Sequence, residues 1–81
     1  MAVTVRFFAA ARSAAGTDTA LVKPGAWADV TRQLLADYPG LAAVLPRCSF
    51  LMDGVAVHTD HSGVVVPDGT ELDVLPPFAG G

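Results

Sequence analysis

The chain has 81 residues, of which 52% are hydrophobic, and its formal net charge at pH 7 is −3. This length suffices for one domain, and five scattered basic residues do not form the basic stripe that nucleic-acid binding requires. No apolar run approaches the roughly 20 residues of a membrane span, no signal-peptide pattern opens the sequence, and one cysteine permits no internal disulfide. We therefore expect a soluble cytoplasmic protein that binds neither nucleic acid nor a membrane.

The first part of the chain predicts two strands and a short helix. Residues 3–8 alternate with period two, which places Val3, Val5 and Phe7 on one face of a strand and Thr4, Arg6 and Phe8 on the other. The alanine-rich residues 9–15 predict a short helix that ends at Gly16. Residues 17–22 predict a second strand, antiparallel to the first.

Residues 27–38 predict the main helix. Apolar residues recur there at three- and four-residue steps, and Pro39-Gly40 ends the pattern. The stripe consists of Trp27, Val30, Leu34, Leu35 and Tyr38. A further helical turn is expected around Leu41, Val44 and Leu45, before Pro46.

The last part of the chain predicts strands only. Asp53-Gly54 lies between the apolar runs 49–52 and 55–57, which indicates a hairpin with a type I′ turn. Residues 58–63 form a polar loop, and residues 64–66 are a short apolar run. Residues 70–75 predict a final strand with Leu72 and Val74 pointing inward and Glu71, Asp73 and Leu75 pointing outward.

One long helix among several strands indicates an α+β domain with two layers. We place the first and last strands side by side in the sheet centre because both are strongly apolar. The predicted fold is therefore a β-grasp (ubiquitin-like) roll, a mixed sheet with one main helix packed on one face. The domain spans residues 1–76, and residues 77–81 form a flexible tail.

The tail ends in Gly80-Gly81 behind Pro76, Pro77, Phe78 and Ala79. Glycine has no Cβ, so two in a row form a thin backbone segment that fits a narrow slot. The prolines end the β-ladder and hold the following residues extended. This pattern predicts a domain that presents the carboxylate of Gly81 to another protein.

The sequence resembles the small subunit of molybdopterin synthase, a member of the ubiquitin-like sulfur carriers. The resemblance rests on Val5-Arg6-Phe7-Phe8-Ala9 with Arg12 and Gly16, and on the closing run from Pro67-Asp68-Gly69-Thr70-Glu71 to Pro76-Pro77-Phe78-Ala79-Gly80-Gly81. It covers the whole length in layout and about a third of it in motif; the diglycine alone also ends carriers of the thiamine and cysteine pathways and ubiquitin-like modifiers.

The resemblance implies a function in molybdenum cofactor biosynthesis. An E1-like adenylyltransferase would use ATP to adenylate Gly81, and sulfur transfer would convert it to a thiocarboxylate. The tail, from Pro76 to Gly81, would insert into the large subunit of molybdopterin synthase, and the thiocarboxylate would donate sulfur to a cyclic pterin precursor. The resemblance also implies a heterotetramer with two copies of each subunit, in which this chain is not catalytic by itself.

Side-chain chemistry is nearly absent. His58-Thr59-Asp60-His61 holds two imidazoles and a carboxylate without an evident fourth ligand, so we expect no metal site and no bound cofactor. Cys48 lies beside a predicted strand, where a free cysteine usually acts as a small buried hydrophobe rather than a nucleophile.

Strand alternation places Phe8, Leu51 and Leu75 on outward positions. They form either an exposed apolar surface that docks a partner or a surface covered by a loop or by residues 9–15. Three functional alternatives also stay open: a sulfur carrier for another pathway, a covalent modifier joined through Gly81 to a substrate lysine, and an interaction module with an incidental tail.

Overall fold

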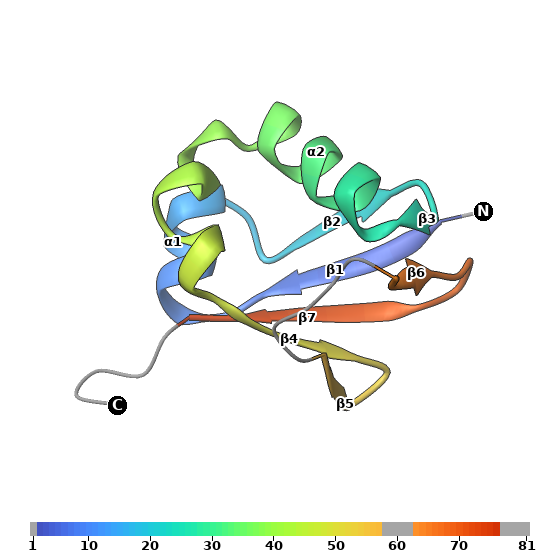
Figure 1. Cartoon of the computed structure of the whole chain (residues 1–81). Coiled ribbons are helices and arrows are strands. Elements are labelled where there is room, and N and C mark those ends of the chain that lie inside the picture. The colour runs from blue at the N-terminus through green and yellow to red at the C-terminus, as the bar shows by residue number, and fades with distance from the viewer. Residues whose placement is uncertain (1, 58–62, 77–81) are drawn as a thin grey trace.

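The computed structural model describes residues 2–57 and 63–76 (Figure 1). The predicted strands and the two predicted helices are present in it, with small shifts at their ends. In chain order the elements are β1 (Val3–Phe7), α1 (Ala9–Ala15), β2 (Thr19–Val22), β3 (Gly25–Ala26), α2 (Trp27–Asp37), the 3₁₀ turns η1 (Pro39–Ala43) and η2 (Leu45–Arg47), β4 (Ser49–Met52), β5 (Val55–Val57), β6 (Val65–Val66) and β7 (Glu71–Leu75).

The main sheet has the strand order β2-β1-β7-β4-β5. β1 and β7 are parallel, with Val5 opposite Leu72, and the other neighbouring pairs are antiparallel. The prediction that the first and last strands lie side by side is therefore confirmed. A parallel pair needs a long crossover connection, and the chain between β1 and β7 supplies it with α2 and the β4–β5 hairpin.

A second, two-stranded sheet pairs β3 with β6 and was not predicted. Gly25 lies opposite Val66, and Ala26 lies opposite Val65. Two residues are too few to produce a period-two pattern, so this pairing depends on the tertiary structure that brings the segments together.

α2 covers one face of the main sheet and encloses the core against it (Figure 1). Val30 and Leu34 of this helix are fully buried, and Trp27 packs its ring edge against Phe50 at 4.9 Å between ring centroids. The predicted apolar stripe is narrower than expected, because Leu35 is 37% exposed. The buried hydrophobic residues are Val3, Val5, Phe7, Ala11, Ala20, Val22, Trp27, Val30, Leu34, Leu41, Leu45, Phe50, Val66, Leu72 and Val74.

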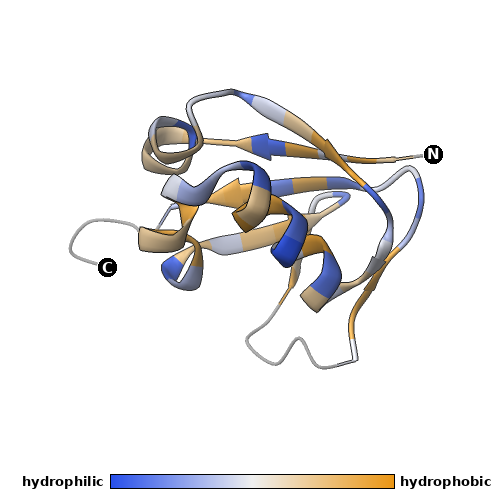
Figure 2. Cartoon of the chain, turned by 90° about the horizontal axis from the view of Figure 1, so that it is seen from above, coloured by the Kyte–Doolittle hydropathy of each residue, from blue (hydrophilic) through white to orange (hydrophobic). Residues whose placement is uncertain are grey.

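The strands alternate between core and outer face as predicted, and Figure 2 shows the corresponding alternation of hydrophobic and hydrophilic residues along them. The outer residues form the second face of the main sheet, opposite α2. Arg6, Asp73 and Leu51 occupy neighbouring positions on this face. This arrangement of a mixed sheet with one main helix on one face is the predicted β-grasp roll.

The two predicted glycine turns have the expected backbone geometry. Gly16 ends α1 with φ of 80°, and its N–H donates to the carbonyl of Arg12 at 2.8 Å. Asp53 and Gly54 have φ values of 50° and 84°, as a type I′ turn between β4 and β5 requires.

Within the described residues, no helix is both long enough and apolar enough to span a membrane.

Candidate functional site

The candidate site begins where the central strand of the main sheet ends. β7 is followed by the half-buried Pro76, the last residue described at this end of the chain. Proline has no N–H for the ladder, which explains why β7 stops here. Pro77, Phe78, Ala79, Gly80 and Gly81, which the sequence assigns to the tail, lie outside the described residues, so their role stays a prediction.

The three residues predicted to dock a partner lie around the end of β7, on the face opposite α2. The backbone N–H of Phe8 donates to the carbonyl of Val74 at 3.1 Å, which holds Phe8 beside β7. β4 lies on the other side of β7, with Ser49 opposite Leu75. Phe8 is 37% exposed, whereas Leu51 and Leu75 are half-buried. These contacts place the three residues near the end of β7, and docking itself stays a prediction.

An ion pair occupies the middle of this face. Arg6 and Asp73 are register partners on β1 and β7, and the Arg6 guanidinium donates two hydrogen bonds to the Asp73 carboxylate, at 2.9 and 3.2 Å. Glu71 lies 3.4 Å from the same guanidinium. Asp73 is only 8% exposed although it points outward, so the sequence placed it on the correct face and missed its burial.

The burial of Asp73 follows from its neighbours. Arg6 lies opposite it on one side and Leu51 on the other. A buried carboxylate is tolerated only when it is paired and hydrogen-bonded, and Arg6 meets both needs. The signal in the sequence was an arginine and an aspartate at outward positions of two strands that were already predicted to be neighbours.

Arg6 also links the ion pair to the apolar residues. Its guanidinium lies over the Phe8 ring, 5.5 Å from the ring centroid, which is within the range of a cation–π contact. The hydrogen bond to Asp73 raises the pKa of Arg6 above its ordinary value. The guanidinium thus stays charged, and it contacts both the Asp73 carboxylate and the Phe8 ring. We call the surface formed by Phe8, Leu51 and Leu75 around Arg6 and Asp73 the exit face.

A groove of about 830 Å³ lies between α2, η2 and the β4–β5 hairpin. Cys48 lines it and is half-buried, and its Sγ donates a hydrogen bond to the carbonyl of Val44 at 3.2 Å. Burial raises the pKa of the Cys48 thiol. A protonated, hydrogen-bonded thiol is a poor nucleophile, which agrees with the predicted role as a small hydrophobe.

The described part of the chain contains no cluster of three or more histidine, cysteine, aspartate or glutamate side chains with metal-binding geometry. His58, Asp60 and His61, the candidate ligands weighed in the sequence, lie outside the described residues.

Comparison with known proteins agrees with this geometry. The ThiS family model matches residues 5–81. The chain is 34% identical over 92 aligned positions to small archaeal modifier protein 3 of Haloferax volcanii, and the match covers all of both chains. The solution structure of the Haloferax volcanii HVO 2177 protein is similar at 35% identity and a TM-score of 0.77, with 100% of this chain and 87% of that one covered.

A second similar structure contains two different subunits. It is the protein–protein complex of subunits 1 and 2 of the molybdopterin-converting factor of Helicobacter pylori. The matched chain is 26% identical to the present one with a TM-score of 0.72, and the match covers all of this chain and all of that chain. Three observations agree on the family. The family model matches residues 5–81, this region ends in Gly80-Gly81, and the fold is a β-grasp roll. The chain belongs to the ThiS family, a family of ubiquitin-like sulfur carriers and modifiers.

Proposed function

We propose that this protein is the sulfur-donating small subunit of a molybdopterin synthase. In this function Gly81 is adenylated by an E1-like enzyme, converted to a thiocarboxylate and inserted into a large catalytic subunit. The observation that carries the proposal is the exit face. The central strand β7 ends at Pro76, near Phe8, Leu51 and Leu75. Only five residues of the sequence follow Pro76, and the last two are Gly80 and Gly81.

The chemistry requires only the tail from this chain. The carboxylate of Gly81 is an anion at neutral pH and a poor acyl electrophile. Adenylation by ATP replaces an oxide leaving group with AMP, and a sulfur nucleophile then attacks the acyl carbon. The thiocarboxylate on its short tether is delivered directly to the partner's active site, where tethering replaces diffusion of free sulfide.

The exit face supports docking because of its composition. Apolar side chains surround an ion pair whose hydrogen bonds are already made within the chain, so a partner can cover them without leaving a charge unpaired. The similarity to a molybdopterin-converting factor subunit that was crystallised with its second subunit supports a partner of this kind.

A second candidate function is covalent modification of other proteins. The similarity to small archaeal modifier protein 3 favours it. The activated acyl group is the same in both functions, and the difference lies in whether sulfur or a lysine amine attacks it. Sulfur carriage for the cysteine or thiamine pathway is a third use of the same activated group.

The first test is the intact mass of the protein after incubation with an E1-like enzyme, ATP and a sulfur source. Replacement of one oxygen by sulfur, absent from a variant without Gly81, is the expected result. An unchanged mass in the presence of a demonstrably active enzyme would overturn the carrier proposal.

A second test decides the pathway. The thiocarboxylate form is mixed with a molybdopterin synthase large subunit and the cyclic pterin precursor, and the dithiolene product is measured. Formation of the product supports the molybdopterin assignment. Loss of sulfur from the carrier only in the presence of cysteine- or thiamine-pathway enzymes would assign it to those pathways.

A further inference from the structure

The groove between α2, η2 and the β4–β5 hairpin has a mainly apolar lining, to which Leu35, Leu45, Pro46 and Val57 contribute. Of these residues, Leu35 and Pro46 are exposed. An apolar concave surface of this kind gains free energy when an apolar side chain covers it. The groove therefore favours an occupant that carries such a side chain.

The groove reaches the place where the chain leaves the main sheet. Ser49 lines the groove and is the register partner of Leu75, the last residue of β7. The Cα atoms of antiparallel partners lie about 4.5–5.5 Å apart. Pro76 follows Leu75 directly, and Cys48, a further lining residue, directly precedes Ser49. The tail thus starts beside the groove.

The sequence after Pro76 has one side chain suited to the groove. Five residues follow, and Phe78 is the one aromatic residue among them. Two residues span at most about 7 Å, so the Phe78 Cα lies within that distance of the Cα of Pro76. So short a tether gives an effective concentration on the order of millimolar at the groove, which favours the chain's own tail over a separate molecule.

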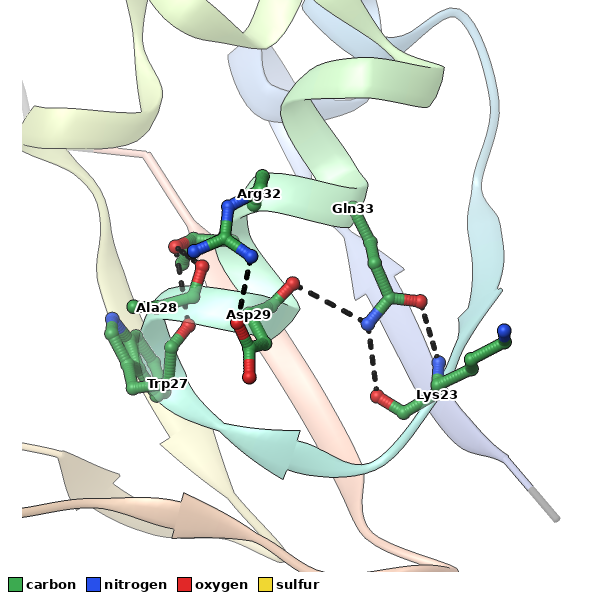
Figure 3. Close-up of polar contacts among 7 residues, drawn as sticks. Lys23, Trp27, Ala28, Asp29, Arg32 and Gln33 are labelled. Carbon is green, nitrogen blue, oxygen red and sulfur yellow. Dashed lines mark hydrogen bonds and ion pairs between the residues drawn. The ribbon is translucent and has the colours of Figure 1, made fainter.

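Arg47 provides a positive charge at the same place. Its guanidinium makes no ion pair with an acidic residue in the ranges 2–57 and 63–76, and its Nη2 donates to the carbonyl of Ala43 at 3.4 Å. Burial raises the pKa of the Cys48 thiol and the Arg47 charge opposes this effect, which places the guanidinium near the groove. The other three arginines do have carboxylate partners, in the pairs Arg6–Asp73, Arg12–Asp18 and Arg32–Asp29, the last of which is drawn in Figure 3.

The tail ends in an anion that matches this charge. The carboxylate of Gly81 is ionised at neutral pH, and a guanidinium binds a carboxylate through two parallel N–H···O hydrogen bonds. Gly81 lies three residues beyond Phe78, at most about 11 Å along the chain. An exposed ion pair contributes little free energy by itself. Burial of the Phe78 ring therefore supplies most of the attraction, and Arg47 determines where the carboxylate lies.

We propose that the tail of the free protein folds back onto this groove, with the Phe78 ring in the groove and the Gly81 carboxylate at Arg47. No covalent bond changes in this step. The inference concerns the chain before activation, so it goes beyond the proposed function and applies equally to a sulfur carrier and to a modifier. A partner that takes the tail into its own channel binds only the undocked fraction, which lowers its apparent affinity by that fraction.

Nuclear Overhauser spectroscopy on the full, unmodified chain measures the contact directly. We expect cross-peaks between the Phe78 ring and the side chains of Leu45 and Pro46, and their absence would overturn the proposal. Arg47→Gln is expected to weaken these cross-peaks because it removes the charge that binds the carboxylate. Arg32→Gln is the matched control, because it removes the same charge from an exposed arginine that does not line the groove. Equal cross-peaks in the two variants would overturn the role of Arg47.

The alkylation rate of Cys48 measures how often the tail is docked. A tail docked about nine-tenths of the time leaves about one tenth of the thiols accessible, so Phe78→Ala is expected to raise the rate about tenfold. Phe78→Leu keeps an apolar side chain and is expected to raise it less, and neither substitution changes the charge near the thiol. Equal rates in all three chains would overturn the proposal.

Dilution of the wild-type protein distinguishes the chain's own tail from that of another copy. Protection of Cys48 by an intramolecular contact is independent of protein concentration, which is the expected result. Protection that falls on dilution would assign the groove to the tail of a second copy and overturn the folded-back arrangement. These measurements use the chain without an E1-like enzyme or ATP, so failure of Gly81 to accept sulfur would contradict the proposed function and leave their results unchanged.

Discussion

Arg6 and Asp73 face each other across the parallel β1–β7 pair and share two hydrogen bonds, at 2.9 and 3.2 Å, on the sheet face opposite the main helix. Asp73 is 8% exposed, so its carboxylate depends on this single arginine for charge compensation. Arg6 of this pair also makes the cation–π contact with the Phe8 ring. The same arginine therefore pairs two strands of the sheet and contributes to the exit face.

The first prediction concerns this pair. Arg6→Leu leaves the Asp73 carboxylate buried without its partner and lowers the melting temperature. The double variant Arg6→Leu/Asp73→Leu removes both charges and is expected to melt at a higher temperature than Arg6→Leu alone. Thermal unfolding followed by circular dichroism measures the order, and a double variant less stable than the single one would contradict the interpretation.

The second prediction concerns docking at the exit face. Phe8→Glu and Leu75→Glu place a charge among the apolar residues near the end of β7, and we expect them to weaken binding to the proposed large subunit by about tenfold or more, as substitution of a central interface residue does. Titration calorimetry measures the affinity. Leu21→Glu is the matched control, because Leu21 is 69% exposed on the same sheet face but on the edge strand β2. Equal loss in all three variants would assign the effect to net charge.

The third prediction concerns Gly40. A Cβ at this position would overlap the backbone carbonyl oxygen of Ala14, where η1 packs against α1. Gly40→Ala therefore forces the two segments apart and costs about 1–3 kcal/mol of stability, as overpacking typically does. Gly63→Ala adds the same methyl group where, apart from its chain neighbours, no atom of the described residues lies within 4 Å. Urea denaturation compares the two variants, and equal stability would contradict the close approach.

The fourth prediction concerns the support of Lys23. Gln33→Ala removes the acceptor for the Lys23 N–H and the donor to its carbonyl, each worth about 0.5–1.5 kcal/mol. The Lys23 amide should then exchange its hydrogen faster while the amides of β1 keep their protection. Native-state hydrogen exchange measured by NMR resolves both. Unchanged exchange at Lys23 would mean that Pro24 and the neighbouring strands suffice to hold the loop.

The fifth prediction concerns the pH dependence of Cys48. Burial raises the pKa of its thiol in the folded protein, so at a pH between the folded and unfolded values the native side chain is protonated and the unfolded one is ionised. Alkylation should therefore reach half its maximal rate at a higher pH in the native protein than in urea. Burial favours the neutral thiol in the native state. The stability that the protonated Cys48 contributes is therefore lost as the pH rises through the folded pKa. Coincident pH profiles would contradict this environment.

The strand alternation and the turn residues of this chain were sufficient to predict most of its local structure. Val3, Val5 and Phe7 alternate so regularly that the buried face of β1 follows from the sequence. Asp53-Gly54 predicts its turn because few residue pairs tolerate two positive φ values. The same local signals predicted both helix ends, and the apolar character of β1 and β7 predicted their pairing.

Other features were decided only by the tertiary structure. The β3–β6 pair is two residues long on each side, so it forms only where the fold brings Gly25 and Val66 together. Asp73 and Arg6 are 67 residues apart, and the burial of Asp73 depends on their register, which sequence periodicity does not specify. Lys23 and Pro76 lie at opposite ends of the sheet because β2 is antiparallel and β7 is parallel to β1. Local patterns specify which residues face inward, whereas contacts between distant segments specify which outward residues meet.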